Sequence, residues 1–195
     1  MSGFTWPPDA SAGDTSSHIP AAVLVPLWMT SESAEPRVVL TRRRRELRRH
    51  AGEISFPGGR RDAEDASLTE TALREAEEEI GLPRADVRLL GSLPSTATFA
   101  TNYVIHPFVG VIPAGIAWRP SALEVDAVLE LPLEELRAGR TRTRLERRGI
   151  SFETDAYVVD GHMIWGATAR ILEHLLERLS VTSPAGERTL ELRRA

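Results

Sequence analysis

The fold is decided by residues 58–82, GGRRDAEDASLTETALREAEEEIGL. The two glycines that open this stretch follow Phe56 and Pro57 and predict a tight turn. An acidic loop containing Ser and Thr then leads into a helix, which we expect to end at Gly81 because Pro83 cannot continue it. We therefore interpret the rest of the chain as support for this helix or as the part that selects what the helix acts on.

A helical wheel divides this predicted helix into three faces. At about 100° per residue, Glu75, Glu78 and Glu79 share one face. Glu70 and Glu77 fall on the opposite side, which we expect to face solvent. Small and apolar residues suited to packing against a sheet form the third face: Thr69, Ala72, Leu73, Ala76 and Ile80.

The acidic face suggests a metal site. Carboxylates at i, i+3 and i+4 repel one another by about 0.2–0.5 kcal/mol per pair on an isolated helix, and by more when they are partly buried. A hard divalent cation offsets this repulsion, and Mg²⁺ characteristically joins one or two carboxylates to waters and substrate phosphates. A solvated acidic surface is the alternative interpretation of a Glu-rich helix. The Gly-Gly pair favours the metal, because it lets bare backbone approach a ligand.

Residues 74–82, REAEEEIGL, resemble the second half of the Nudix box, in which Arg-Glu, an apolar residue, any residue, Glu-Glu, any residue, Gly and an apolar residue follow in order. In the first half, five residues separate Gly59 from Asp65, which stands where the box has a Glu, and eight residues rather than seven lie between Asp65 and Arg74. The resemblance implies that Asp65 orients Arg74. It also implies a site for Mg²⁺ or Mn²⁺ whose catalytic and metal-binding groups are Glu75, Glu78, Glu79 and the carbonyl of Gly59.

A second resemblance lies just upstream and concerns the substrate. VLTRRR at residues 39–44 is followed, at the same spacings, by Arg48, Gly52 and Phe-Pro-Gly-Gly, and this resembles the motif of coenzyme A pyrophosphatases. Arg44 departs from that motif, which usually has Ser or Ala there. The substrate-binding candidates are Arg43, Arg48, His50 and Tyr103. A solvated charged surface remains the alternative for the six arginines of residues 42–49, and a structural hydrogen-bonding role the alternative for His50.

Composition fits one compact domain. The chain has 195 residues, 42% of them hydrophobic, and no cysteine, which excludes disulfides, thiolate metal sites and a catalytic cysteine. No apolar run approaches the ~18 residues of a membrane span, and the N-terminus lacks the features of a signal peptide, so we expect a soluble, cytoplasmic protein. The net charge of −4 argues weakly against nucleic-acid binding. We expect a flexible arm over residues 1–18, one domain over 19–182 and a polar tail over 183–195.

The remaining segments alternate between strands and helices. Pro26 predicts an edge or bulged position for the first strand. Residues 132–136 predict a short helix, residues 137–149 an exposed Arg-rich loop, and residues 163–166 the opening of the last helix, residues 167–179. The predicted strands are residues 21–28, 37–42, 87–93, 103–112, 128–133 and 150–159. Glu124, in the loop before the fifth strand, is the candidate for a further ligand or general base by its context, with Asp126 as its competitor.

These patterns indicate α/β architecture, and the resemblance specifies the Nudix fold, a mixed β-sheet sandwiched between α-helices. It implies hydrolysis of the diphosphate bond of coenzyme A or its derivatives, giving phosphopantetheine, or its acylated form, and adenosine 3′,5′-bisphosphate. The alternatives are a Nudix pyrophosphatase acting on ADP-ribose, NADH or dinucleoside polyphosphates, a regulatory module that binds a nucleotide without cleaving it, and an interaction protein with an acidic surface helix. A homodimer is plausible by resemblance.

Overall fold

The computed structural model describes residues 18–28, 35–44, 52–98, 102–147 and 149–181. Its strands are β1 (Ile19–Trp28), β2 (Arg37–Arg43), β3 (Ile54–Ser55), β4 (Gly58–Arg60), β5 (Arg88–Ser92), β6 (Thr96–Ala97), β7 (Tyr103–Val111), β8 (Val125–Pro132), β9 (Arg140–Arg147), β10 (Ile150–Val159) and β11 (His162–Trp165). Its helices are α1 (Leu68–Ile80), the 3₁₀ turn η1 (Arg84–Asp86), α2 (Leu133–Ala138) and α3 (Gly166–Val181). All but His18 of the predicted N-terminal arm, and the whole predicted tail, lie outside these residues.

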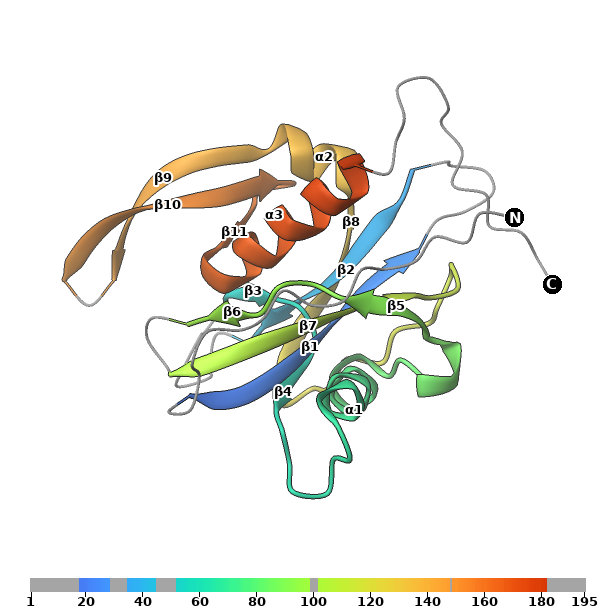
Figure 1. Ribbon diagram of the computed structural model, residues 1–195. Coiled ribbons are helices and arrows are strands. Elements are labelled where there is room, and N and C mark those ends of the chain that lie inside the picture. The colour runs from blue at the N-terminus through green and yellow to red at the C-terminus, as the bar shows by residue number, and fades with distance from the viewer. Residues whose placement is uncertain (1–17, 29–34, 45–51, 99–101, 148, 182–195) are drawn as a thin grey trace.

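A mixed sheet forms the centre of the molecule, in the order β3-β2-β1-β7-β5, with β4 paired to β1, β6 to β7 and β8 to β2. Only the β1–β7 pair is parallel among the strand pairs of the described residues. Helix α1 lies on one face of the sheet and α3 on the other (Figure 1). A smaller antiparallel sheet, β11-β10-β9, extends from the side of α3 (Figure 1). The predicted sheet between helices is therefore confirmed.

Strand β1 is apolar along its length because both of its faces are buried. Val23, Val25 and Leu27 join the core cluster that includes the apolar stripe of α3. Ala22 and Leu24 point the other way, into the cluster that contains the packing face of α1. Alternating side chains of a strand point to opposite faces of a sheet, so a strand between two helical layers is hydrophobic at every position.

The predicted edge or bulged position of Pro26 is wrong. β1 is an inner strand that pairs with β7 without a register shift from Ile19 to Leu27. On its other side β1 pairs first with β4, at residues 21–23, and then with β2, at residues 27–28. Leu24 donates its N–H toward that second side, to the carbonyl of Pro57, so Pro26, two residues later, faces the interval between β4 and β2. A residue without an N–H fits there because no partner strand needs its donor.

Two predictions about the C-terminal third are also wrong. Residues 140–147 are not a loop but strand β9, which pairs with β10 from Arg140–Tyr157 to Arg147–Ile150. Residues 162–165 are strand β11, so the last helix begins only at Gly166, whose φ of 68° is left-handed. In both cases the partner strand supplies hydrogen bonds that local composition does not reveal. None of the helices in the described part is long and apolar enough to span a membrane.

Candidate active site

The glycine pair lies in strand β4 rather than in a tight turn, which corrects the sequence-based prediction. Residues 58–60 run antiparallel to β1 at Ala22 and its neighbours. A Cβ on Gly58 would lie 2.3 Å from the carbonyl oxygen of Ala22, and a Cβ on Gly59 would lie 2.4 Å from Oε1 of Glu75. Gly58 therefore requires glycine because of close approach to the backbone of the neighbouring strand, whereas a Cβ at Gly59 would displace the movable carboxylate of a catalytic candidate.

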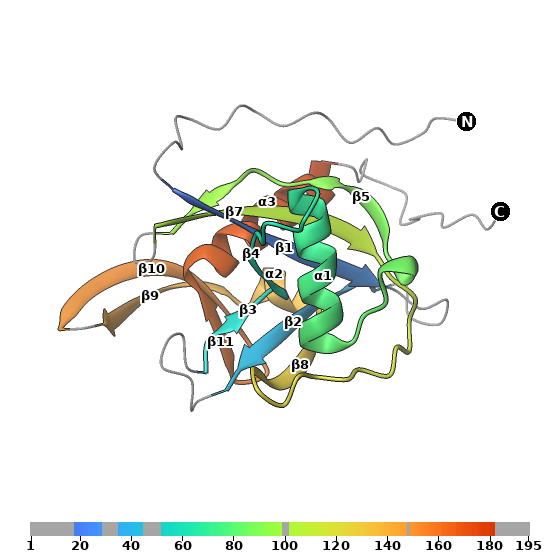
Figure 2. The ribbon, with the colours of Figure 1, turned by 90° about the horizontal axis from the view of Figure 1, so that it is seen from below.

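Helix α1 has the three faces that the wheel predicts. Ser67 caps its start by accepting the N–H of Glu70, and Gly81 ends it in the left-handed conformation. Ala72, Ala76 and Ile80 are buried against the sheet. Figure 2 shows α1 in front of the sheet that it covers. On the opposite side, Arg84 pairs with both Glu70 and Glu77, at 3.1 Å and 2.9 Å. These two glutamates are therefore remote from the acidic face.

Asp65 holds Arg74 as the resemblance implies, despite its shorter side chain and the additional loop residue. Both oxygens of Asp65 accept hydrogen bonds from Arg74, from Nε and from Nη2, each at 3.0 Å. The hydroxyl of Thr71 and the N–H of Asp62 add bonds of 2.8 Å and 2.9 Å. The Arg74 guanidinium, followed by these bonds, keeps the pKa of Asp65 well below its usual range despite burial. Thr71 was missed by the sequence analysis, since its burial follows only from the position of Asp65.

Arg74 in turn positions two of the predicted ligands. Its Nη1 lies 3.0 Å from Oε1 of Glu75 and 3.2 Å from Oε2 of Glu78. Glu75 is largely buried, whereas 60% of the Glu78 side chain is exposed. Burial raises the pKa of Glu75, and the negative charges of Glu78 and Glu124 raise it further, whereas Arg74 lowers it. The charged form of a carboxylate with these neighbours is stabilised when a cation binds beside it.

Glu79 is the most deeply buried carboxylate of the acidic face. Only 4% of the residue is exposed. Its Oε2 accepts the N–H of Gly58 at 3.3 Å, and its Oε1 lies 3.6 Å from Nη1 of Arg43. Burial raises the pKa of Glu79 from its ordinary 4.5 to about 8, and Glu75 and Glu124 also raise it. The two favourable contacts are long, so the charge of Glu79 is incompletely compensated.

Glu124 reaches this cluster, and its competitor Asp126 does not. Nη2 of Arg43 lies 3.7 Å from Oε2 of Glu124 while its Nη1 faces Glu79, so one guanidinium stands between two carboxylates. Asp126 instead accepts a hydrogen bond of 2.7 Å from Nε of Arg42. The geometry favours Glu124 over Asp126 as the additional acidic group of the site.

Of the three other substrate-binding candidates, only Tyr103 lies within the described residues. Arg48 and His50 lie outside the described residues. Tyr103 begins strand β7, where it is paired with Ile19, accepts the N–H of Thr98 at its carbonyl and donates its own N–H to the hydroxyl of Thr98. Ile19 is three residues before the β1 position that faces Gly59, which is about 10 Å along the strand. The structure therefore brings Arg43, but not Tyr103, to the acidic face of α1.

The oxygen ligands of this site suit a hard divalent cation, although the guanidinium groups of two arginines lie among the carboxylates. As the side chains are placed, no group of three or more His, Cys, Asp or Glu residues within the described ranges is close enough to hold a metal ion. Arg43 and Arg74 pair with the carboxylates that would converge. The candidate ligands are all oxygens, and two of them carry raised pKa values through burial and mutual repulsion. This is the donor chemistry that Mg²⁺ and Mn²⁺ prefer.

The fold and this acidic helix define a hydrolase domain of the Nudix class. Residues 18–150 match the family model described as NUDIX domain. The chain belongs to the Nudix family and is a Nudix hydrolase. Members of this family generally use divalent metal ions and act on small nucleotide-linked substrates.

Proteins similar in sequence include the "Uncharacterized Nudix hydrolase NudL" of Yersinia pestis (strain Pestoides F), 40% identical over 163 residues that cover 83% of this chain and 80% of that protein. The protein of the same description from Yersinia pseudotuberculosis (serotype O:1b, strain IP 31758) gives the same values. The identity and coverage agree with the family assignment.

Two solved structures share the fold at 16% sequence identity. The Nudix hydrolase RenU of M. smegmatis gives a TM-score of 0.59 and covers 87% of this chain and 91% of its own. The NUDIX domain of Shewanella oneidensis NrtR, solved with ADP ribose, gives 0.53 and covers 83% and 88%. At this identity the likeness concerns the fold alone.

Proposed function

We propose that this Nudix hydrolase cleaves the diphosphate bond of coenzyme A or its derivatives, releasing phosphopantetheine, or its acylated form, and adenosine 3′,5′-bisphosphate. The observation that carries the proposal is the position of Arg43. This residue belongs to the upstream motif that resembles coenzyme A pyrophosphatases, and its guanidinium lies within 3.6–3.7 Å of Glu79 and Glu124. The substrate motif and the acidic face of α1 therefore meet at one place.

In the proposed site, Glu75, Glu78, Glu79 and the Gly59 carbonyl hold Mg²⁺ or Mn²⁺. An ion held by these residues would supply charge neutralisation at the diphosphate and would lower the pKa of a water for attack on phosphorus. Glu75 and Glu79 are the indispensable ligands.

Four further side chains complete the proposed site. The Asp65–Arg74 pair keeps Glu75 oriented through the 3.0 Å contact described above. Arg43 binds a phosphate oxygen, and its buried Nε, which has no hydrogen-bond partner among the described residues, is a donor available for one. Glu124 serves as an additional ligand or as the general base.

The rival substrates are ADP-ribose, NADH and dinucleoside polyphosphates. A Nudix-like module that binds a nucleotide without cleaving it is the rival of another class. Intact, crowded carboxylates argue against a pure binder, since the mutual repulsion of Glu75, Glu79 and Glu124 has no use in a site that does not hold metal. The proposal also includes a cytoplasmic location and allows a homodimer.

The test is a substrate panel with products identified by mass. The full-length protein is incubated with coenzyme A, ADP-ribose, NADH and diadenosine polyphosphates in Mg²⁺ or Mn²⁺. Preferential cleavage of coenzyme A to adenosine 3′,5′-bisphosphate and phosphopantetheine is the expected result. Preference for another member of the panel would replace the substrate, and no cleavage of any of them would favour the binding module.

A variant pair checks the role of Arg43. Arg43→Ala is expected to raise the KM for coenzyme A by about 10- to 100-fold, the range for loss of a charge-assisted contact to phosphate. Arg84→Ala removes an arginine with two ion pairs on the far face of α1 and is expected to leave KM unchanged. If the two variants behaved alike, Arg43 would have only a structural role.

A further inference from the structure

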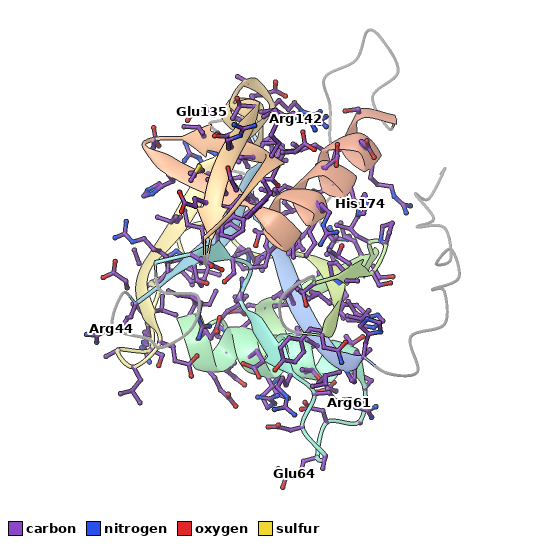
Figure 3. All side chains as sticks on the ribbon, turned by 90° about the vertical axis from the view of Figure 1, so that its left-hand side faces the viewer. Arg44, Arg61, Glu64, Glu135, Arg142 and His174 are labelled. Atoms are coloured by element: carbon purple, nitrogen blue, oxygen red, sulfur yellow. The ribbon has the colours of Figure 1, made fainter. Side chains whose placement is uncertain are left out.

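Three consecutive arginines at the end of β2 have three different partners. Arg42 pairs with Asp126, and Arg43 faces Glu79 and Glu124. Arg44 is bound twice to the segment of residues 121–124, which we call the Glu124 turn. Its backbone N–H donates to the carbonyl of Glu124 at 2.9 Å, and its guanidinium donates to the carbonyl of Ala122. Figure 3 shows Arg44 beside the loop that leads into β8.

The Glu124 turn also contacts the end of the catalytic helix. Ser121 donates its N–H to the carbonyl of Glu79 at 2.8 Å, and Arg119 donates to that of Ile80 at 3.0 Å. These carbonyls belong to the last turn of α1, where helices leave acceptors without internal partners. The chain then folds back on itself, because the amides of Glu124 and Val125 both bond to the carbonyl of Ser121, at 3.1 Å and 2.9 Å. The turn therefore bridges the end of α1 and the end of β2.

Burial does not hold this turn in place. Ala122 and Glu124 are exposed, and 82% of Leu123 is exposed. A turn with no buried apolar side chain depends on its polar contacts for a defined position. Ser121 fixes the beginning of the turn, Arg43 pairs with the carboxylate of Glu124, and Arg44 supplies two contacts to the backbone carbonyls of the remaining residues. A small residue at position 44, as in the motif that the upstream segment resembles, has no side chain able to reach the carbonyl of Ala122.

We infer that Arg44 is a positioning residue that holds the Glu124 turn against β2 and thereby keeps the Glu124 carboxylate at the catalytic cluster. The inference rests on the proposed function, because it assigns a purpose to Glu124 in catalysis. It also explains why an arginine at this position does not indicate a different substrate: its guanidinium is directed to the protein's own backbone.

The position of the turn is measured without reference to activity, by amide hydrogen exchange of the metal-free, full-length chain. Arg44→Ala is expected to accelerate exchange at Glu124 and Val125 by about tenfold or more, since both amides are protected by the fold of the turn. Arg44→Lys keeps one donor and is expected to give an intermediate rate. Arg84→Ala is the matched control and is expected to exchange as the wild type does. Unchanged exchange in Arg44→Ala would overturn the inference.

A double-mutant cycle with Glu124→Gln shows whether Arg44 acts through Glu124. Arg44→Ala is expected to lower kcat by about 10- to 100-fold, the loss typical of a displaced catalytic group, with little change in KM. In the Glu124→Gln background the same substitution is expected to cause no further loss, because the group that Arg44 positions is already missing. Losses that multiply in the double variant would show an independent structural role and overturn the inference.

The same measurements separate this inference from the proposed function. If Glu124→Gln alone retained full activity, the catalytic purpose of the Glu124 turn would be wrong, and so would the inference. Cleavage of coenzyme A in the substrate panel would still stand in that case. If the panel instead identified another diphosphate substrate, the exchange experiment would stay the same because it uses no substrate. The double-mutant cycle would then be measured with the new substrate.

Discussion

Replacing Glu79 with Gln is expected to stabilise the metal-free protein at high pH while abolishing its activity. Burial raises the pKa of Glu79 from 4.5 to about 8. At about 1.4 kcal/mol per unit, this rise corresponds to an ionisation cost of about 5 kcal/mol. Local relaxation and water penetration reduce the cost of a buried charge, so we expect about 2 kcal/mol in practice. Gln has the shape of the protonated side chain and no charge to bury.

The sign follows from the direction of the pKa change. The folded protein keeps the proton of Glu79 to a higher pH than the unfolded chain does, so the contribution of this group is fully present below pH 4.5. It is lost progressively as the pH rises from 4.5 through about 8. Gln cannot titrate, so the free energies of unfolding of the variant and the wild type should be similar near pH 5. They should differ by about 2 kcal/mol, in favour of the variant, near pH 9.

Urea denaturation in EDTA at pH 5, 7 and 9 measures this difference, with Glu77→Gln as the control. Glu77 lies on the same helix but is exposed and paired with Arg84, so its variant should follow the wild type at each pH. Saturating Mg²⁺ should restore the stability of the wild type at pH 9, because a ligand that binds only the folded state stabilises it. Mg²⁺ should not change the free energy of unfolding of Glu79→Gln. Parallel pH profiles of the wild type and Glu79→Gln, or a folded Glu79→Gln with near-normal Mg²⁺-dependent turnover, would refute the reasoning.

Three further predictions concern the same site. Gly59→Ala puts a Cβ 2.4 Å from the Glu75 carboxylate, a movable group, so kcat should fall by about 100-fold while the melting temperature changes little; a fully active variant would contradict the close approach. Asp65→Asn weakens the bidentate contact with Arg74 and should lower the free energy of unfolding by about 2–3 kcal/mol at pH 7, measured in urea, with the difference beginning to shrink only as the pH falls from 3.8 toward the lowered pKa of Asp65 in the folded protein. EDTA should abolish turnover, and titration with Mg²⁺ or Mn²⁺, but not with a monovalent salt, should restore it.

Much of α1 could be predicted because its determinants are local. The three faces depend on spacings of three and four residues, and the ends on Ser67 and Gly81, all within one stretch of chain. Its glutamates were assigned correctly to the acidic and solvent faces because a helix fixes the angle between neighbours. The contact between Asp65 and Arg74 is what the resemblance to the Nudix box implies, and it does not follow from helix geometry because Asp65 lies in the loop before α1.

The errors share a different cause, which is pairing with another strand, whether that strand is near in the chain or far from it. Pro26 was assigned to an edge or bulge because a proline lacks an N–H, yet it lies in an inner strand where the partner changes from β4 to β2. Residues 140–147 were assigned to a loop from their charge, yet β10 pairs with them along their length. Neither partner can be recognised from the composition of the segment itself, since a strand's stability comes from its neighbours across the sheet.

An acidic helix with defined ends, a glycine pair ahead of it and an upstream arginine motif can all be recognised in the sequence alone. Tertiary structure decided how these parts meet: Gly59 against Glu75, Arg43 between Glu79 and Glu124, and Arg44 on the turn that carries Glu124. Helix geometry relates residues a few positions apart, whereas these contacts join residues 16 to 81 positions apart and exist only once the sheet has fixed the register of β2, β4 and β8.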